Sequence, residues 1–370
     1  MSRFAVAPLL AAVVAALTTW LLIAGWLRFG SRSALLDSPH KRQAMHDLPV
    51  PRVGGLAMCL SCVLVLCGGV FAQAMPLGNT LAAALGIALA LTLLSAFDDA
   101  KSLPVLPRLL LHLIAAIAAV ILLLQTAAQS IEIPSVAFRW LMDPLGMSIV
   151  VIGIVWLANL FNFMDGSNGL LGGCAAVGFA ALALTANTAG TVPGLCLTAA
   201  AIAGALVGFL PHNLPVARVF MGDAGAVPLG FLAAITGLYG NLKGVWSWWY
   251  PFAVFAPLIV DATYTLIKRT LAGKPPWQAH REHCYHRLIR QLGWTHAQVA
   301  GLYAGLCLIG AAFVAPAVRS TKNGTTALAI GIFTVITYAL LLILLEKRLQ
   351  IKRLQTRPLD QEKNLTDRQQ

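Results

Sequence analysis

Several acidic residues stand at breaks between apolar runs, and their spacing suits metal-assisted chemistry on a phosphate. Asp98 and Asp99 are adjacent at the end of one run, Asp165 lies in a polar break, and Asp223 directly precedes another run. Two neighbouring carboxylates repel each other unless a cation lies between them or one is protonated. Mg²⁺ is usually held by one or two carboxylates together with substrate phosphates. The alternatives are a solvated helix end for Asp98 and Asp99 and a helix N-cap for Asp223.

The polar break at 159–169 is rich in asparagine and glycine and holds no lysine or arginine. Asn162 and Asn168 can read the edge of a base or sugar, and Gly166 allows close approach of the backbone to a ligand. A simple turn built from Asn and Asp is the alternative.

Two basic segments suit an anion. The first, 37–55, combines His46 and Arg52 with prolines and a Gly-Gly pair, which is typical of a phosphate-binding loop or of an ordinary basic cytoplasmic loop. The second, 280–287, spaces three histidines at i, i+3 and i+6. Zinc is one interpretation, but the neighbouring arginines would repel a cation and favour a diphosphate. A basic surface helix is the third.

The elements that must position these residues are membrane helices. Of the 370 residues, 58% are hydrophobic and only 11% are charged, which excludes an ordinary soluble enzyme, a disordered chain and a fibrous protein. About 20 apolar residues cross a bilayer. We therefore predict an all-α, polytopic membrane protein with eleven spans, at 4–27, 53–72, 79–97, 106–127, 146–161, 170–187, 192–210, 224–240, 246–267, 297–316 and 325–345.

The distribution of cations predicts the orientation. Of 26 lysines and arginines, 21 fall in alternate segments on one side, and by the positive-inside rule that side is cytoplasmic. The net charge of +12 is thereby explained without nucleic acid. Eleven spans place the N-terminus outside and the C-terminus in the cytoplasm, and all the segments discussed above fall on the cytoplasmic face. We expect one membrane domain over 1–346 and a basic cytoplasmic tail over 347–370.

The cysteines show no zinc-type spacing. We interpret all seven as small buried hydrophobic residues without disulfides. The first apolar run is too long for the core of a signal peptide and is expected to be an uncleaved helix.

The motifs together resemble the polyprenyl-phosphate N-acetylhexosamine-1-phosphate transferases, the family of MraY and the WecA-like enzymes. Five motifs carry the resemblance, in order along the chain: Asp-x-Pro…His…Pro-x-Pro-Arg-x-Gly-Gly (37–55), Asp-Asp (98–99), Asn-x-x-Asn-x-x-Asp-Gly-x-x-Gly-Leu (159–170), Asn-x-x-Pro…Phe-Met-Gly-Asp-x-Gly (213–225) and His-Arg-x-His…His-Arg (280–287).

The resemblance implies a reaction. N-acetylhexosamine 1-phosphate would pass from a UDP-HexNAc to undecaprenyl phosphate, giving undecaprenyl-diphosphate-HexNAc and UMP, with Mg²⁺ as cofactor and Mn²⁺ as a substitute. It further implies a bacterial inner-membrane enzyme in contact with membrane lipids, it allows a homodimer, and it involves no nucleic acid.

The resemblance also implies roles for individual residues. Asp98, Asp99 and Asp223 would be catalytic, and Asp223, Asp98 and Asp165 would bind the metal. Substrate contacts are expected from His46, Arg52, Asn162, Asp165, Gly166, Asn168, Asn213, Phe220, Asp261, His280, Arg281, His283, His286 and Arg287.

The sequence differs from the MraY-like members of the family at two places. MraY-like members have an acidic residue where this chain has Asn168, and they carry adjacent histidines where this chain intersperses arginines. These differences argue against UDP-MurNAc-pentapeptide, which stays an alternative within the family. They favour the WecA-like enzymes that start O-antigen and other cell-envelope polysaccharides from UDP-GlcNAc, UDP-FucNAc or UDP-QuiNAc. The competing class is a transporter or flippase for a polyprenyl-linked sugar. Such a protein is expected to have carboxylates near the midplane of the bilayer and inverted repeats. In this sequence the acidic residues cluster at one face and no repeat is evident.

Overall fold

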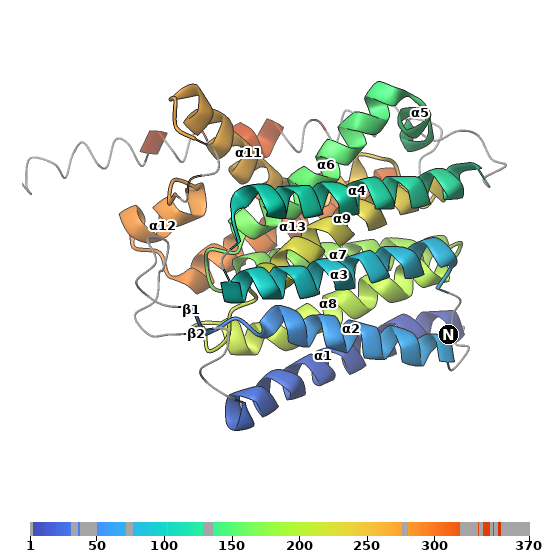
Figure 1. Ribbon diagram of the computed structural model, residues 1–370, viewed down its shortest axis with the longest axis horizontal. Helices are drawn as coiled ribbons and strands as arrows, with labels where there is room; N and C mark the ends of the chain where they lie inside the picture. The colour runs from blue at the N-terminus through green and yellow to red at the C-terminus, as the bar shows by residue number, and fades with distance from the viewer. Residues whose placement is uncertain are drawn as a thin grey trace, which may run out of the picture.

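The protein is a bundle of long helices that run roughly parallel, as Figure 1 shows for a computed structural model. The structure describes residues 3–30, 36–37, 50–71, 77–101, 103–128, 136–275, 278 and 280–318, with short pieces between 332 and 348. The helices are α1 (Arg3–Phe29), α2 (Gly54–Phe71), α3 (Asn79–Lys101), α4 (Val105–Ala128), α5 (Val136–Met142), α6 (Pro144–Met164), α7 (Leu170–Ala189), α8 (Pro193–Asn213), α9 (Asp223–Leu242), α10 (Tyr250–Val254), α11 (Ala256–Leu271), α12 (Cys284–Leu292) and α13 (His296–Val318). Two short strands, β1 (Leu36–Asp37) and β2 (Val50–Pro51), pair antiparallel.

The all-α membrane fold expected from the sequence is confirmed. Within the described part of the chain, nine helices are long and apolar enough to cross a membrane: α1, α2, α3, α4, α6, α7, α8, α9 and α13. The short run at 146–161 is among them, extended to Pro144–Met164. The last expected span, 325–345, and the tail 347–370 lie almost entirely outside the described residues, so the total of eleven stays a prediction.

One expected span is wrong as a single helix. The run 246–267 forms two helices, α10 and α11, which are separated at Phe255. Each begins with a proline in its first turn, Pro251 in α10 and Pro257 in α11. Proline suits the start of a helix but lacks the N–H that a continuous helix needs there, so the chain breaks before Pro257.

The centre of the bundle is formed by α8 and α9, whose residues are almost all buried. Small residues let the helices approach closely. Gly204 and Gly208 of α8 lie one turn apart, and a Cβ on either would collide with the backbone of α1 at Ala12 or Ala16. This close packing through glycine is common between membrane helices. It gives a rigid base from which the loops at one end of the bundle project.

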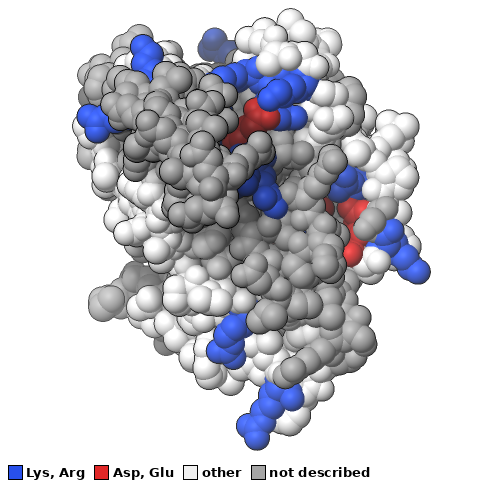
Figure 2. All heavy atoms as spheres, turned by 90° about the vertical axis from the view of Figure 1, so that its left-hand side faces the viewer, with Lys and Arg blue, Asp and Glu red and all other residues white. Residues whose placement is uncertain are grey.

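The described parts of the five sequence motifs gather at that end, on the left in Figure 1, where β1, β2 and α12 also lie. Figure 2 looks onto this end and shows acidic side chains set among lysines and arginines. Among the cysteines, which are all free thiols, Cys174, Cys196, Cys284 and Cys307 are buried as expected. Cys67 is exposed, so the expectation of burial is wrong for that residue, and Cys59 and Cys62 are only partly buried.

Candidate active site

The first motif is fixed to the fourth by backbone pairing. The Phe220 N–H donates to the Pro51 carbonyl (2.8 Å), and the Gly54 N–H donates back to the Phe220 carbonyl (3.0 Å). The Gly55 N–H extends the pairing to the Met221 carbonyl at 2.9 Å. Gly55 also packs directly on the backbone of Gly225, where a Cβ would not fit. This close approach explains the Gly-Gly pair and brings Arg52 over the start of α9.

Arg52 pairs with the second carboxylate of the Asp-Asp motif. Its Nη1 lies 2.7 Å from Asp99 Oδ1, and the Ala224 N–H donates to Asp99 Oδ2 at 3.3 Å. The side chain of Asp99 is only 1% exposed. Gly222 has a φ of 71°, and a Cβ there would lie 2.7 Å from Asp99 Oδ2. The buried carboxylate of Asp99 therefore connects α3 to the start of α9 and to the loop that carries Arg52.

Arg108 joins the other two carboxylates. Its Nη1 lies 3.1 Å from Asp98 Oδ2 and 3.5 Å from Asp223 Oδ2. The second oxygen of Asp98 accepts from the Leu103 N–H at 2.6 Å. Asn162 Nδ2 donates to Asp223 Oδ2 at 3.2 Å. In the sequence, Arg108 aligns only loosely with a basic residue of the family that the motifs resemble, and it was not counted among the expected site residues.

Two alternatives for these carboxylates are wrong. Asp98 is only 7% exposed and is held by two hydrogen bonds, so it is not a solvated helix end. Asp223 is the first residue of α9, whose N-cap is Gly222, so it does not cap the helix. The side chain of Asp223 is 24% exposed, which makes it more accessible than Asp98 or Asp99.

Asp165 belongs to the same cluster. It ends α6, where its N–H donates to the Asn162 carbonyl at 3.3 Å. Burial, and next the negative charge of Asp223, raise the pKa of Asp165 well above its usual range, although the Arg52 charge opposes the shift. A cation near Asp165 and Asp223 would relieve this repulsion.

The carboxylates of the cluster fit Mg²⁺ by the type of their ligand atoms, but they do not by themselves form a complete coordination shell. Asp98, Asp165 and Asp223 offer the carboxylate oxygens that Mg²⁺ prefers. Among the described residues, however, no three His, Cys, Asp or Glu side chains are placed to hold one ion together. Mg²⁺ commonly takes only one or two carboxylates and completes its shell with substrate phosphates and water. The cluster fits an ion that arrives with a phosphate substrate.

The asparagine–glycine loop is locked to the fourth loop by Asn213. The Gly169 N–H donates to Asn213 Oδ1 (2.5 Å), and Asn213 Nδ2 donates to the Val219 carbonyl (2.9 Å). Gly169 has a φ of 72°, which explains the glycine. Asn213 is buried and both ends of its amide are used, so its place is that of a positioning residue. Asn168 donates to the Pro215 carbonyl at 3.3 Å, and Phe220 is half-buried beside the cluster.

The histidine–arginine segment docks on the asparagine–glycine loop through α12. The hydroxyl of the fully buried Tyr285 donates to the Phe163 carbonyl at 3.0 Å. A Cβ on Gly166 would collide with that hydroxyl and lie 3.1 Å from the His286 ring. The interpretation of the segment as a basic surface helix is wrong for two of its histidines, because His283 is 2% and His286 is 4% exposed. Sequence analysis missed the docking role of Tyr285, which a tyrosine in a basic segment does not reveal.

Asp261 holds the start of α12. Its Oδ1 accepts from the Cys284 N–H (2.8 Å) and Thr265 Oγ1 (3.2 Å). Its Oδ2 accepts from the Tyr303 hydroxyl (2.7 Å) and the Tyr285 N–H (3.3 Å). The carboxylate is fully buried, so it acts on the site through α12.

Glu282 adds a second anchor for the same segment. It pairs with the buried Arg269 at the end of α11 and with Lys274, whose Nζ lies 3.0 Å from Glu282 Oε1. These pairs fix the loop that leads into α12. They were not expected, since each partner alone looks like a surface charge.

Two histidines of this segment, His280 and His286, are neutral at pH 7. Burial, and next the electrostatic effect of His283, lower the pKa of His280 to about 4 and that of His286 to about 3. Each of these two rings can then donate one N–H but carries no charge, and Arg281 and Arg287 supply positive charge to the segment. Of the remaining expected site residues, His46 lies outside the described residues.

A cleft joins the carboxylates to an apolar wall. It has a volume of about 330 Å³ and lies between α3, α4, α6 and α9. Asp98, Arg108, Asn162 and Asp223 line one part of it; Leu91, Leu94, Leu109, Ile152 and Trp156 are among the residues that line the rest. The cleft thus suits a ligand with an anionic head and a hydrocarbon tail.

Known proteins resemble this chain over part or most of its length. Residues 81–241 match the family model described as glycosyl transferase family 4. A probable undecaprenyl-phosphate N-acetylglucosaminyl 1-phosphate transferase of Bacillus subtilis is 29% identical over 77% of each chain. A decaprenyl-phosphate N-acetylglucosaminephosphotransferase of Mycolicibacterium smegmatis is 29% identical over 92% of this chain and 89% of its own. A phospho-N-acetylmuramoyl-pentapeptide-transferase of Nostoc punctiforme is 33% identical over 56% of this chain and 58% of its own. The chain is thus similar to glycosyl transferase family 4 over 161 of its 370 residues, and to curated membrane transferases that are named for polyprenyl phosphates or for the muramoyl-pentapeptide.

Proposed function

We propose that the protein transfers N-acetylhexosamine 1-phosphate from a UDP-HexNAc to undecaprenyl phosphate, giving undecaprenyl-diphosphate-HexNAc and UMP. The observation that carries the proposal is the cleft, in which Asp98, Arg108 and Asp223 face a hydrocarbon wall. The relatives named for polyprenyl-phosphate substrates support it.

The acceptor phosphate would sit at the polar end of the cleft with its isoprenoid chain along the apolar wall. Arg108 can neutralise the acceptor and is itself oriented by Asp98. An oxygen of the acceptor phosphate attacks the phosphorus that carries the sugar. The bond from that phosphorus to the UMP oxygen breaks, and UMP leaves with the electron pair. Such transfer depends mainly on positioning and charge neutralisation.

We propose Mg²⁺, with Mn²⁺ as a substitute, at Asp223, with Asp98 and Asp165 as the other carboxylates of the cluster. When bound, the ion would neutralise the diphosphate and the charge on departing UMP. Asp99 supports the cluster through Arg52 and the start of α9.

The donor would lie over the asparagine–glycine loop. Asn162, Gly166 and Asn168 can face the nucleotide, and Phe220 can stack on uracil. Arg281 and Arg287 can bind the diphosphate or the sugar, together with His283 and with the neutral rings of His280 and His286. Asn213 and Asp261 are proposed as positioning residues rather than substrate contacts.

The relatives bear on the sugar. The bacillary and mycobacterial proteins are named for N-acetylglucosamine, and they align over more of the chain than the pentapeptide transferase does. We therefore propose a WecA-like enzyme that uses UDP-GlcNAc or a related UDP-HexNAc, in the first membrane step of O-antigen or another cell-envelope polysaccharide. The site would face the cytoplasm at the inner membrane, with the N-terminus outside.

A panel of nucleotide sugars tests this assignment. Purified protein in lipid nanodiscs with undecaprenyl phosphate and Mg²⁺ is given UDP-GlcNAc, UDP-FucNAc, UDP-QuiNAc or UDP-MurNAc-pentapeptide, and release of UMP is measured. The proposal expects UMP from one of the first three and none from Asp223→Asn. UMP from the pentapeptide donor alone would assign the other branch of the family. Movement of a lipid-linked sugar across the bilayer without UMP release would favour the transporter.

A further inference from the structure

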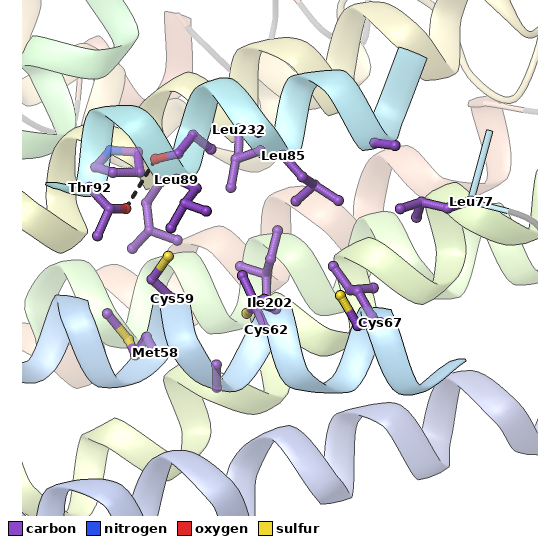
Figure 3. A pocket seen from close by; sticks show the side chains of 18 of the residues that line it. Met58, Cys59, Cys62, Cys67, Leu77, Leu85, Leu89, Thr92, Ile202 and Leu232 are labelled. Carbon is purple, nitrogen blue, oxygen red and sulfur yellow. Dashed lines mark hydrogen bonds between the residues drawn. The ribbon is translucent and has the colours of Figure 1, made fainter. Parts of the chain in front are cut away.

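A second, separate groove lies on the opposite side of α3 from the cleft. It has a volume of about 590 Å³ and is lined by α2, α3, α8 and α9, from Gly55 at the acidic end of the bundle to Phe71 at the other. It shares no lining residue with the cleft. In Figure 3, side chains of α2 such as Cys59 and Cys62 point across it toward Leu85 and Leu89 of α3.

The lining suits hydrocarbon and nothing charged. No residue that lines the groove is acidic or basic, and the hydroxyl of Thr92 is used by the Ala88 carbonyl at 3.1 Å. The groove lies between helices long and apolar enough to cross a membrane. Surrounded by bilayer, such a space is filled by a hydrocarbon chain rather than by water.

The two ends of the groove differ. At the acidic end, the lining includes Gly55, which packs directly on Gly225. At the other end, the lining includes Val70 and Phe71, which are 46% and 93% exposed. These exposed side chains offer a hydrocarbon chain access at the end remote from the acidic cluster.

A cation and a phenol stand at the open end. The Tyr239 hydroxyl would lie 3.7 Å from a Cβ on Gly78, which lines that end. Lys243 Nζ lies 5.9 Å from the centre of the Tyr239 ring. Tyr239 itself is buried, at 6% exposure, whereas a half-buried lysine such as Lys243 at the edge of an apolar band typically faces lipid head groups. We infer that the groove binds a membrane phospholipid, with one acyl chain between α2 and α3 and the phosphate near Lys243.

The bound acyl chain would extend the contact between α2 and α3, the two helices next to Arg52 and Asp99. The ion pair of Arg52, just before α2, with Asp99, at the end of α3, joins the two helices at the acidic end. An acyl chain in the groove would fill the space between them along the rest of their length.

Photolabelling tests the inference without any turnover. The protein in nanodiscs is exposed to one of three probes with a diazirine in the hydrocarbon: phosphatidylglycerol, the matching diacylglycerol without phosphate, or polyprenyl phosphate. Labelled peptides of α2 and α3 are then quantified by mass spectrometry. We expect the phosphatidylglycerol probe to label the groove.

Two substitutions give the sharp contrast. A Cβ on Gly86 meets nothing within 4 Å, so Gly86→Leu fills the groove without a clash and should lower labelling at least about tenfold. Lys243→Gln should lower labelling by phosphatidylglycerol about fivefold and leave diacylglycerol unchanged. Gly68→Leu, on α2 but away from the groove, and Arg139→Gln, on α5, are the matched controls.

Some results would overturn the inference. One is labelling of Gly86→Leu at the level of the wild type. The other is labelling of the groove by polyprenyl phosphate but not by the phospholipid. Ala82→Leu replaces Gly86→Leu if the latter does not fold. Because labelling is read without substrate, failure of the proposed transferase activity would leave this result intact.

Discussion

Replacing Asp261 by asparagine tests whether α12 is positioned by a buried carboxylate. Each oxygen of Asp261 accepts two hydrogen bonds, from Cys284 N and Thr265 on one side and from Tyr303 and Tyr285 N on the other. An asparagine keeps one of these oxygens and sets an NH₂ donor against the other two donors. A buried donor left without its acceptor costs about 1–3 kcal/mol. Two of them predict a loss of about 2–6 kcal/mol in the docking of α12.

The assay has a structural and a kinetic part. We expect Asp261→Asn to lower the melting temperature in detergent and to make the loop before α12 more sensitive to limited proteolysis. Because α12 packs on Gly166, the KM for the UDP-sugar should rise more than kcat falls. Tyr303→Phe removes one donor and should give a smaller change in the same direction.

Asp143→Asn serves as the control. Asp143 caps α6 by accepting from the Gly146 N–H at 2.7 Å, and asparagine caps a helix about as well. It should change neither KM nor proteolysis. Wild-type melting and KM in Asp261→Asn would refute the positioning role, because α12 would then be held by other contacts.

Three further predictions follow from the site. Asp98→Asn and Asp223→Asn should each lower turnover at least about a hundredfold with folding intact, measured as UMP release; near-normal rates in both would place the site elsewhere. Chelation by EDTA should abolish turnover and added Mg²⁺ or Mn²⁺ should restore it, so full activity in the chelator would contradict the metal assignment. His286, whose pKa is lowered to about 3, takes up a proton in the unfolded chain near pH 6.5 but not in the folded one, so stability should fall as pH drops from about 6.5 toward 3, by about 1.4 kcal/mol per pH unit. Melting curves of wild type and His286→Asn across this range check that sign, since the variant should lose less stability.

Much of the fold was predictable because membrane helices are encoded locally. A run of about 20 apolar residues is readable without tertiary contacts, and nine such runs are helices within the described residues. The break between α10 and α11 was less visible, because Pro251 and Pro257 stand in an apolar run and hydropathy alone joins the two segments. The burial of Cys67 was misjudged because hydropathy does not tell which face of α2 meets neighbouring helices.

Most residues of the site could be predicted from the sequence, but the burial and the contacts of each residue could not. Motif spacing brought forward Arg52, Asp98, Asp99, Asn162, Asp165 and Asp223, which the structure places together. Which of them are buried depends on contacts between distant segments. Asn213 and Asp261 were expected to touch substrate. In the structure, the amide of Asn213 binds backbone groups, and the carboxylate of Asp261 accepts from two backbone N–H groups and two side-chain hydroxyls. Arg108 gains its importance only when α3, α4 and α9 meet.

The most direct test of the central proposal follows the phosphate attached to the sugar. Purified protein in nanodiscs with undecaprenyl phosphate and Mg²⁺ is supplied with UDP-GlcNAc, or with the active donor from the panel, labelled in its β-phosphate. Transfer of the sugar together with its phosphate predicts that this label enters the lipid fraction while one UMP is released per lipid product. Appearance of the label in free UDP, with sugar on the lipid, would contradict the account, because it would show transfer of the sugar without its phosphate.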